Sequence, residues 1–355
     1  MNSGKQPAIT LSTVALPVLA VSAAAAFFYF AAPILIPMTI AAATAYTLIP
    51  VVEFLKKIKV PHFLAVLIVM MAFLGISVVL AFVLISEIAD LVSDFPNYQQ
   101  AALAFFDEAK IFVGSYLEQI PGLYSQIKDF KLDPSYFSGA GKMFFKSIGS
   151  LTSLGFQAFL LFFLTYFILS DYDMFVEKFK TLFGADKKAT TSSMLNQIDK
   201  QLRGFITVKV GVTIGMSLVF TIGLLIMKVP YAYICGPLAG VLNLFPYVGA
   251  IIGAIPPIVI AGITNNSVGA MIPVGLLFLI VQILESNLIT PKLTSDSVDL
   301  NPLAVLVSSI IWGYLWGAIG VIMAVPITAA VKVVCDNVES LEPIGLLLGG
   351  RGNKN

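Results

Sequence analysis

The sequence predicts an all-α, polytopic transmembrane protein with about eight spans, a broken or re-entrant helical region and a helical extracytoplasmic insertion. Two observations predict this fold class. The 355-residue chain is 58% hydrophobic and only 12% charged, with a mean hydropathy of +0.93, whereas soluble domains carry about 25% charged residues. Several apolar stretches also reach the roughly 20 residues that a helix needs to cross a bilayer.

Eight stretches are long and apolar enough to be interpreted as spans. They cover residues 9–31, 33–52, 63–85, 149–170, 205–227, 231–262, 268–289 and 302–334. A second apolar stretch follows the first almost at once, so the first is expected to be a signal anchor, not a cleaved signal peptide. The chain then divides into spans one to three (1–85), the insertion (86–148), span four (149–170), a cytoplasmic amphipathic linker (171–203), spans five to eight (204–335) and a cytoplasmic tail (336–355).

The orientation follows from the basic residues in the short connections. Lys56, Lys57 and Lys59 fill the link between the second and third spans, and the 171–203 linker is rich in lysine. Because basic residues in short links are retained in the cytoplasm, both links are expected there. An even number of spans then places the N- and C-termini in the cytoplasm as well.

The insertion at 86–148 is expected on the opposite side of the membrane, and it holds more acidic than basic residues. Apolar residues recur in it with helical spacing, which predicts a folded helical element. Pro96, Pro121 and Pro134 are expected to divide it into short helices. An external gate, a subunit contact and a small packed cap all remain open for this segment.

Several classes of soluble function are excluded. His62 is the only histidine and the chain has no phosphate-binding glycine loop, so no histidine-based active site, zinc protease helix or nucleotide hydrolysis is expected. Cys235 and Cys335 alone cannot form a metal site. The net charge of +1 gives no general attraction for nucleic acid. We therefore expect no enzyme, cofactor or metal, and any pumping must use an ion gradient or a separate ATPase.

The stretch 231–262 holds four prolines and is too broken for a plain helix. One interpretation is two half-helices that meet near Pro246, Tyr247 and Gly249, with Asn243 and freed backbone groups facing a transport pathway. The other is a kinked or re-entrant packing element without a ligand. Four pairs of glycines spaced four residues apart, two of them within this stretch, are expected to let helices pack closely. These pairs are Gly211 and Gly215, Gly236 and Gly240, Gly249 and Gly253, and Gly313 and Gly317.

Glu285 is the only carboxylate within the seventh predicted span. Gln282 lies one turn before it on the same helical face, and Asn287 follows two residues later. A carboxylate within a membrane is costly and is usually functional. Glu285 could exchange a proton or hold a cation in a pathway, but its place near the edge of the span also allows a solvated interfacial position.

Lys209 is a second intramembrane charge. It lies six residues beyond Arg203, roughly 9 Å into the fifth predicted helix. Its long side chain could return to the membrane surface. It could equally line a pathway, as a partner of Glu285 or of a substrate oxygen.

Four runs of residues carry a family resemblance. They are Arg203-Gly204, the run 243–249, the run from Glu285 through Pro291 to Lys292, and the last span with Asn301, Pro302, Gly313, Gly317 and Gly320. Together they make the chain similar to the autoinducer-2 exporter family of bacterial membrane proteins, also called PerM-like permeases. The resemblance covers nearly the whole chain and implies a bacterial inner-membrane transporter, with the residues of these runs near the pathway.

The resemblance is specific for the family but not for the cargo, because some members are named for export of autoinducer-2 and others are assigned sodium/proton antiport. The leading hypothesis is ion-driven export of a small, uncharged, hydroxyl-rich signal, with Gln282, Asn287 and Asn243 as hydrogen-bonding groups. The second is sodium/proton antiport through Glu285. The third is a non-transport membrane scaffold. The partners expected are the lipid bilayer, a small polar solute or cation, and further copies of the chain in a homo-oligomer.

Overall fold

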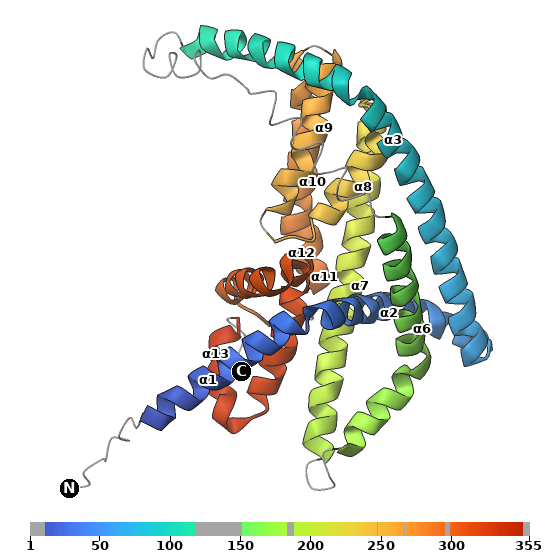
Figure 1. Ribbon diagram of the computed structural model, residues 1–355, viewed down its shortest axis with the longest axis vertical. Helices are drawn as coiled ribbons and strands as arrows, with labels where there is room; N and C mark the ends of the chain where they lie inside the picture. Colours follow the sequence, from blue (N-terminus) through green and yellow to red (C-terminus); the bar gives the residue numbers. More distant parts are fainter. Residues whose placement is uncertain are drawn as a thin grey trace.

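A computed structural model describes residues 11–117, 151–182, 188–246, 248–265, 267–294 and 299–350. The regular structure in these ranges is helical, as predicted (Figure 1). Its elements are α1 (Leu11–Phe30), α2 (Ala32–Lys57), α3 (His62–Leu117), α6 (Leu151–Leu182), α7 (Lys188–Ile226), α8 (Ala232–Leu242), α9 (Gly249–Asn265), η1 (Val268–Ala270), α10 (Met271–Leu284), η2 (Glu285–Ile289), α11 (Thr290–Thr294), α12 (Pro302–Asp336), η3 (Glu339–Leu341) and α13 (Glu342–Leu348).

Six stretches of the described helices have the length and composition to cross a membrane. They are Ala32–Lys57, His62–Leu91, Gly155–Tyr172, Ser192–Ile226, Val268–Ile289 and Pro302–Asp336. The other two predicted spans correspond to shorter apolar helices, namely the end of α1 and the pair α8 and α9. The polytopic helical class is therefore confirmed. The departures from the predicted spans lie where a helix continues through an expected break or is interrupted within an expected span.

The first departure concerns α1 and α2, which were expected to be two separate crossings. Only Ala31 lies between them, and its N–H donates to the Phe27 carbonyl while its own carbonyl accepts from Leu35 at 2.9 Å. The helical hydrogen bonding is thus almost unbroken, so the chain cannot reverse its direction here. Figure 1 shows α1 leading into α2 without a hairpin.

The second departure concerns α3, a single helix of 56 residues. The expected break at Pro96 is absent, because α3 continues through this proline to Leu117. A proline inside a helix removes one backbone hydrogen bond and bends the helix without having to end it. Figure 1 shows α3 curving over the ends of α8 and α9, which it contacts. Residues 118–148 of the predicted insertion, with Pro121 and Pro134, lie outside the described residues.

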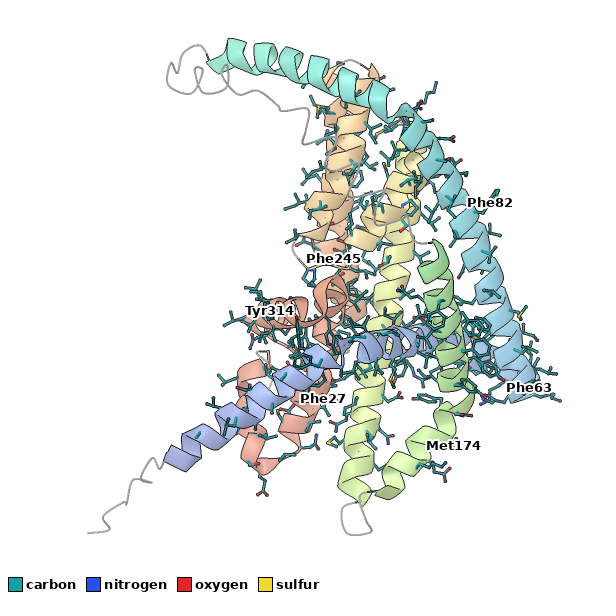
Figure 2. All side chains as sticks on the ribbon, viewed as in Figure 1. Phe27, Phe63, Phe82, Met174, Phe245 and Tyr314 are labelled. Atoms are coloured by element: carbon teal, nitrogen blue, oxygen red, sulfur yellow. The ribbon has the colours of Figure 1, made fainter. Side chains whose placement is uncertain are left out.

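The helices pack around two separate hydrophobic cores. The first core joins α2, α3 and α6 and includes Ile49, Met70 and Leu169. The second joins α7, α8, α9 and α10, where the rings of Phe220 and Phe278 stack with their centroids 4.2 Å apart. Many large apolar side chains point outward, as Phe63 and Phe82 do on α3 in Figure 2. Such an apolar exterior fits lipid contact.

Helices α8 and α9 pack against each other, and α8 packs closely on α7. A methyl group at Gly236 would lie 2.6 Å from the backbone nitrogen of Thr221, and one at Gly240 would lie 2.8 Å from that of Ser217. The packing role predicted for this glycine pair is therefore confirmed. It is wrong for Gly211 and Gly215, since a methyl group at either would meet no atom within 4 Å.

The last predicted span, 302–334, is also interrupted. Gly317 within α12 has φ 62° and ψ −141°, a backbone conformation open essentially to glycine alone. At the break the two parts of α12 approach closely, because a methyl group at Gly320 would lie 1.9 Å from the carbonyl oxygen of Trp312. The indole of Trp316 donates to the Phe28 carbonyl at 2.9 Å, which ties α12 to α1.

The part of the predicted tail that the structure describes folds back onto α12. Asn301 caps α12 by accepting from the Ala304 N–H at 2.7 Å, and its amide donates to the Leu347 carbonyl of α13 at 2.6 Å. Lys332 bridges Asp299 and Asp336 nearby. These bonds fasten the C-terminal helix to the start of α12.

Candidate functional site

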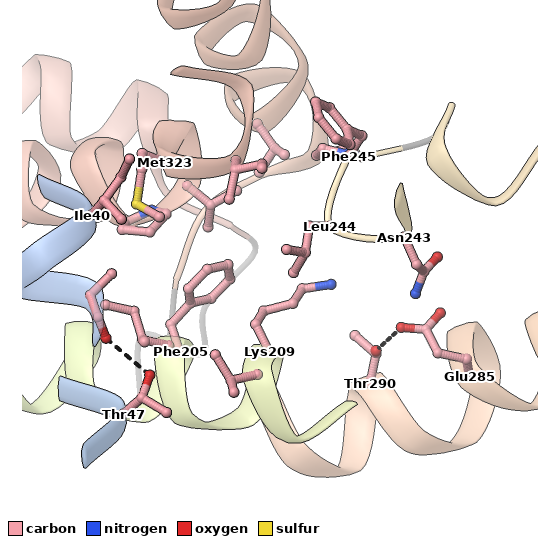
Figure 3. Close-up of a pocket in the computed structure, with 18 of the residues that line it drawn as sticks. Ile40, Thr47, Phe205, Lys209, Asn243, Leu244, Phe245, Glu285, Thr290 and Met323 are labelled. Atoms are coloured by element: carbon pink, nitrogen blue, oxygen red, sulfur yellow. Dashed lines mark hydrogen bonds between the residues drawn. The ribbon is translucent and has the colours of Figure 1, made fainter. Parts of the chain in front are cut away.

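A cavity of about 680 Å³ lies among α2, α7, the α8–α9 turn, the α10–α11 region and the second part of α12. Figure 3 shows it in close-up. Its walls draw on elements of both hydrophobic cores, so it lies where the two cores meet. The polar side chains among its lining residues are Thr44, Thr47, Lys209, Asn243, Gln282, Glu285, Ser286 and Thr290.

Glu285 lines this cavity and is only 5% exposed. It begins a π-helical turn, η2, in which the backbone N–H of Thr290 donates to the Glu285 carbonyl. The same turn lets the Thr290 hydroxyl donate to Oε1 of Glu285 at 2.5 Å, and Gln282 Nε2 donates to Oε2 at 3.2 Å. Both carboxylate oxygens therefore accept from neutral donors of the same helical segment. Glu285 is therefore buried and hydrogen-bonded in this fold.

Lys209 lies on α7 and lines the same cavity. Its side chain extends into the cavity, as Figure 3 shows. Within the part of the chain that the structure describes, its amine makes no hydrogen bond or ion pair. The structure therefore places Lys209 and Glu285 in one cavity without pairing them.

The turn between α8 and α9 contributes Asn243, Leu244, Phe245 and Pro246 to the cavity wall. Phe245 N–H donates to the Leu242 carbonyl at 2.9 Å, which closes the turn. Gly249 does not line the cavity. It supports the turn, because only a residue without a side chain fits there: a methyl group would lie 1.7 Å from the Leu242 carbonyl oxygen. The predicted meeting of two half-helices is thus observed. Tyr247, also predicted for the pathway, lies outside the described residues.

Three other predicted pathway residues do not line the cavity. Arg203 pairs with Glu53 of α2 at 2.8 Å and contacts Tyr172 of α6 and Asp199 of α7. Asn287 is exposed and donates to the Ile283 carbonyl at 2.9 Å. Lys292 is exposed as well. The side chain of Pro291 lies outside the described residues.

The structure adds hydroxyl groups that were not singled out from the sequence. Thr44 and Thr47 on α2, and Ser286 and Thr290 after α10, all line the cavity. The hydroxyls of Thr44 and Thr47 donate to the carbonyls of Ile40 and Ala43, which is the ordinary behaviour of threonine in an apolar helix. Only their position beside the cavity distinguishes them, and that position depends on the packing of α2 against α7.

Metal binding by a compact cluster finds no support in the described ranges, where no group of three or more His, Cys, Asp and Glu side chains occurs. The site instead combines a buried carboxylate, a lysine, amides and hydroxyls with walls made from interrupted membrane helices. Secondary transporters build solute and ion sites in this way. Fold and site together define a helical membrane transport protein.

The chain belongs to the AI-2E transporter family, whose sequence model matches residues 18–340. A protein of Bacillus subtilis (strain 168) that carries the name "Putative transport protein YrrI" is 26% identical to the chain over 308 residues, which are 85% of each chain. The AI-2 transport protein TqsA of Escherichia coli (strain K12) is 25% identical over 321 residues, which are 90% of each chain. The resemblance to the autoinducer-2 exporter family is therefore confirmed, and the chain is a bacterial inner-membrane protein with a role in transport.

Proposed function

We propose that the chain is a secondary transporter that exports a small polar solute such as autoinducer-2, driven by an ion gradient. The observation that supports this most is the buried Glu285 carboxylate on the wall of the 680 Å³ cavity. Cavities of about 300–1,000 Å³ hold small organic molecules. A carboxylate in such a place can exchange a proton or hold a cation while the solute occupies the rest of the cavity.

The other cavity residues fit a polar solute. The amides of Asn243 and Gln282 can donate and accept hydrogen bonds, and the hydroxyls of Thr44 and Thr47 keep lone pairs that can accept. The relative TqsA of Escherichia coli is named as an AI-2 transport protein, and the chain belongs to the AI-2E transporter family. Autoinducer-2 is therefore the first substrate to test.

Sodium/proton antiport is the second candidate, and Glu285 is the observation that favours it. A cation exchanger needs a carboxylate that binds either a proton or the cation. In the part of the chain that the structure describes, Glu285 is the only carboxylate that lines the cavity. A non-transport scaffold is less well supported, since a scaffold has no use for such a cavity.

The purified protein in sealed vesicles separates these functions. Flux of autoinducer-2 and of a panel of cations is measured over a range of pH, for the wild type, for Glu285→Gln and for the exposed-site control Lys292→Gln. Glutamine keeps the shape of the glutamate side chain but cannot titrate. We expect Glu285→Gln to lower the flux sharply and to flatten its pH dependence, and Lys292→Gln to change neither.

Cation flux without autoinducer-2 flux would contradict the proposed export and support sodium/proton antiport. No flux of either kind in the wild type would count against transport of these substrates. Wild-type flux with unchanged pH dependence in Glu285→Gln would remove Glu285 from the coupling mechanism.

We also propose a homo-oligomer and an orientation in which the link after α2 and the C-terminus face the cytoplasm. The large apolar exterior of α3 offers contact area for further copies. A monomer mass both in mild detergent and in native lipid would contradict the oligomer. An impermeant thiol reagent applied to intact cells should label a cysteine placed at Asn265 but not one placed at Lys57. A cysteine at Lys5 tests the N-terminus separately, because α1 and α2 do not form a hairpin.

A further inference from the structure

We propose that Lys209 forms an oxyanion subsite in the cavity, so that the solute carries a negatively charged oxygen as well as hydroxyl groups. The proposal rests on the proposed transport function of this cavity. It goes beyond that function because it assigns the charge of the solute. It also replaces the uncharged solute expected from the sequence.

The cavity wall carries two charges of opposite sign. Among the described residues that line the cavity, Lys209 and Glu285 are the only ionisable ones. If the two formed an ion pair, the Lys209 ammonium would not be free to bind a ligand oxygen. They are not paired, since Glu285 already accepts from Thr290 at 2.5 Å and from Gln282 at 3.2 Å. The charge of Glu285 remains, but both of its oxygens already have donors, whereas the Lys209 amine has no partner among the described residues.

The position of Lys209 favours the cavity over a role as a surface anchor. A lysine that returns to the membrane surface lays its chain along its own helix toward the helix end. The side chain of Lys209 instead extends from α7 into the cavity (Figure 3), and it is only partly exposed. An ammonium group withdrawn from bulk water is costly unless an oxygen acceptor or an opposite charge compensates it. No described residue of the chain supplies one, so a ligand oxygen is the natural partner.

The surroundings of Lys209 fit an anion of small size. Asn243 offers amide donors from the α8–α9 turn, and Ala250 places the first turn of α9 on the cavity wall. The N-terminal turn of a helix carries a partial positive charge, which supports the same preference. Thr44 and Thr47 lie across the cavity on α2 and can accept from hydroxyl groups of the solute. The class indicated is a small hydroxylated organic anion.

A matched set of three probes tests this directly. Radiolabelled glycerol, glycerate and glycerol 3-phosphate share a carbon skeleton and differ mainly in charge, and their equilibrium binding to the purified full-length protein is measured in mild detergent. The proteins compared are the wild type, Lys209→Gln, Lys209→Arg and the exposed-site control Lys292→Gln. Thermal unfolding of each variant shows that the fold is intact.

We expect the wild type to bind glycerate or glycerol 3-phosphate roughly tenfold or more tightly than glycerol, because a hydrogen bond between two charged groups contributes at least that factor. Lys209→Arg should keep the preference and Lys209→Gln should lose it, with glycerol binding unchanged. Lys292→Gln should behave as the wild type. Equal binding of all three probes, binding of none, or a preference that survives in Lys209→Gln would overturn the subsite.

The transport function is tested separately by flux in sealed vesicles. Flux of autoinducer-2 or of a cation without an anion preference would overturn the Lys209 subsite alone. An anion preference that depends on Lys209, in a protein that moves no solute, would support the subsite and count against transport.

Discussion

The Thr290 hydroxyl donates to Oε1 of Glu285 at 2.5 Å, across the five-residue spacing of a π-turn. An ordinary α-helix places residues three and four apart on one face, so residues five apart need this local widening of the helix. The widening has a cost, and π-turns are frequent at functional sites. Here the turn positions a buried carboxylate on the cavity wall.

The first prediction concerns this bond. Thr290→Val removes the hydroxyl while keeping the branched shape, so one oxygen of the buried carboxylate loses a donor at a cost of about 1–3 kcal/mol. We expect lower flux in vesicles and a lower melting temperature, both largely restored in Thr290→Ser. Flux and stability equal to wild type in Thr290→Val would show that Glu285 does not depend on Thr290.

The second prediction concerns the contact of α8 with α7. Gly236→Ala puts a methyl group 2.0 Å from the hydroxyl oxygen of Thr221 and 2.6 Å from its backbone nitrogen, so the two helices must move apart. Overpacking of this kind costs about 1–3 kcal/mol, and we expect a clear fall in melting temperature. Gly211→Ala is the matched control, because its methyl group meets nothing within 4 Å. An equal effect of both substitutions would contradict the packing argument.

Local features of the sequence predicted the parts of the site that depend on local chemistry. Pro246 and Gly249 mark the turn between α8 and α9 because both residue types are unfavourable in a helix interior. Glu285 and Lys209 were identified because charges are rare in membrane helices. All four predictions rest on a property of the residue itself, which a sequence states directly.

The features that the sequence did not predict depend on three-dimensional packing. Thr44 looks like any threonine of an apolar helix, and its role follows only from where α2 lies. Arg203 was expected in the pathway but forms an ion pair with Glu53, which is 150 residues away in the chain. Gly317 was expected to pack against a neighbour, whereas it breaks α12 by its positive φ. A glycine in an apolar run fits either role.

The third prediction concerns this break in α12. Gly317→Ala has room for the methyl group, since nothing lies within 4 Å of it, but φ 62° with ψ −141° is strained for any residue with a side chain. Strain of this kind costs on the order of 1–3 kcal/mol. We expect a lower melting temperature in detergent. Gly215→Ala in the middle of α7 is the control and should be neutral or slightly stabilising, because alanine favours the helix. A neutral Gly317→Ala would mean that α12 can run straight through residue 317.

The last prediction concerns the ion pair that joins the two cores beside the cavity. Arg203 of α7 lies 2.8 Å from Glu53 of α2, and their side chains are 28% and 52% exposed. Exposed pairs contribute only about 0–1 kcal/mol to stability, so removing this pair should hardly lower the melting temperature. Its position matters more, because α2 belongs to one core and α7 to the other, and the cavity lies between them.

If solute crosses by a movement of one core against the other, then a covalent link between α2 and α7 should stop transport. Cysteines at Glu53 and Arg203, in a background with Cys235→Ala and Cys335→Ala, are joined by a cleavable bifunctional thiol reagent. We expect flux in vesicles to fall to background after linking and to return when the reagent is cleaved. Each single cysteine variant, treated in the same way, should retain its flux. Undiminished flux in the linked protein would show that α2 and α7 move as one body, and the movement that opens the cavity would then have to lie elsewhere, with the break at Gly317 in α12 as the next place to test.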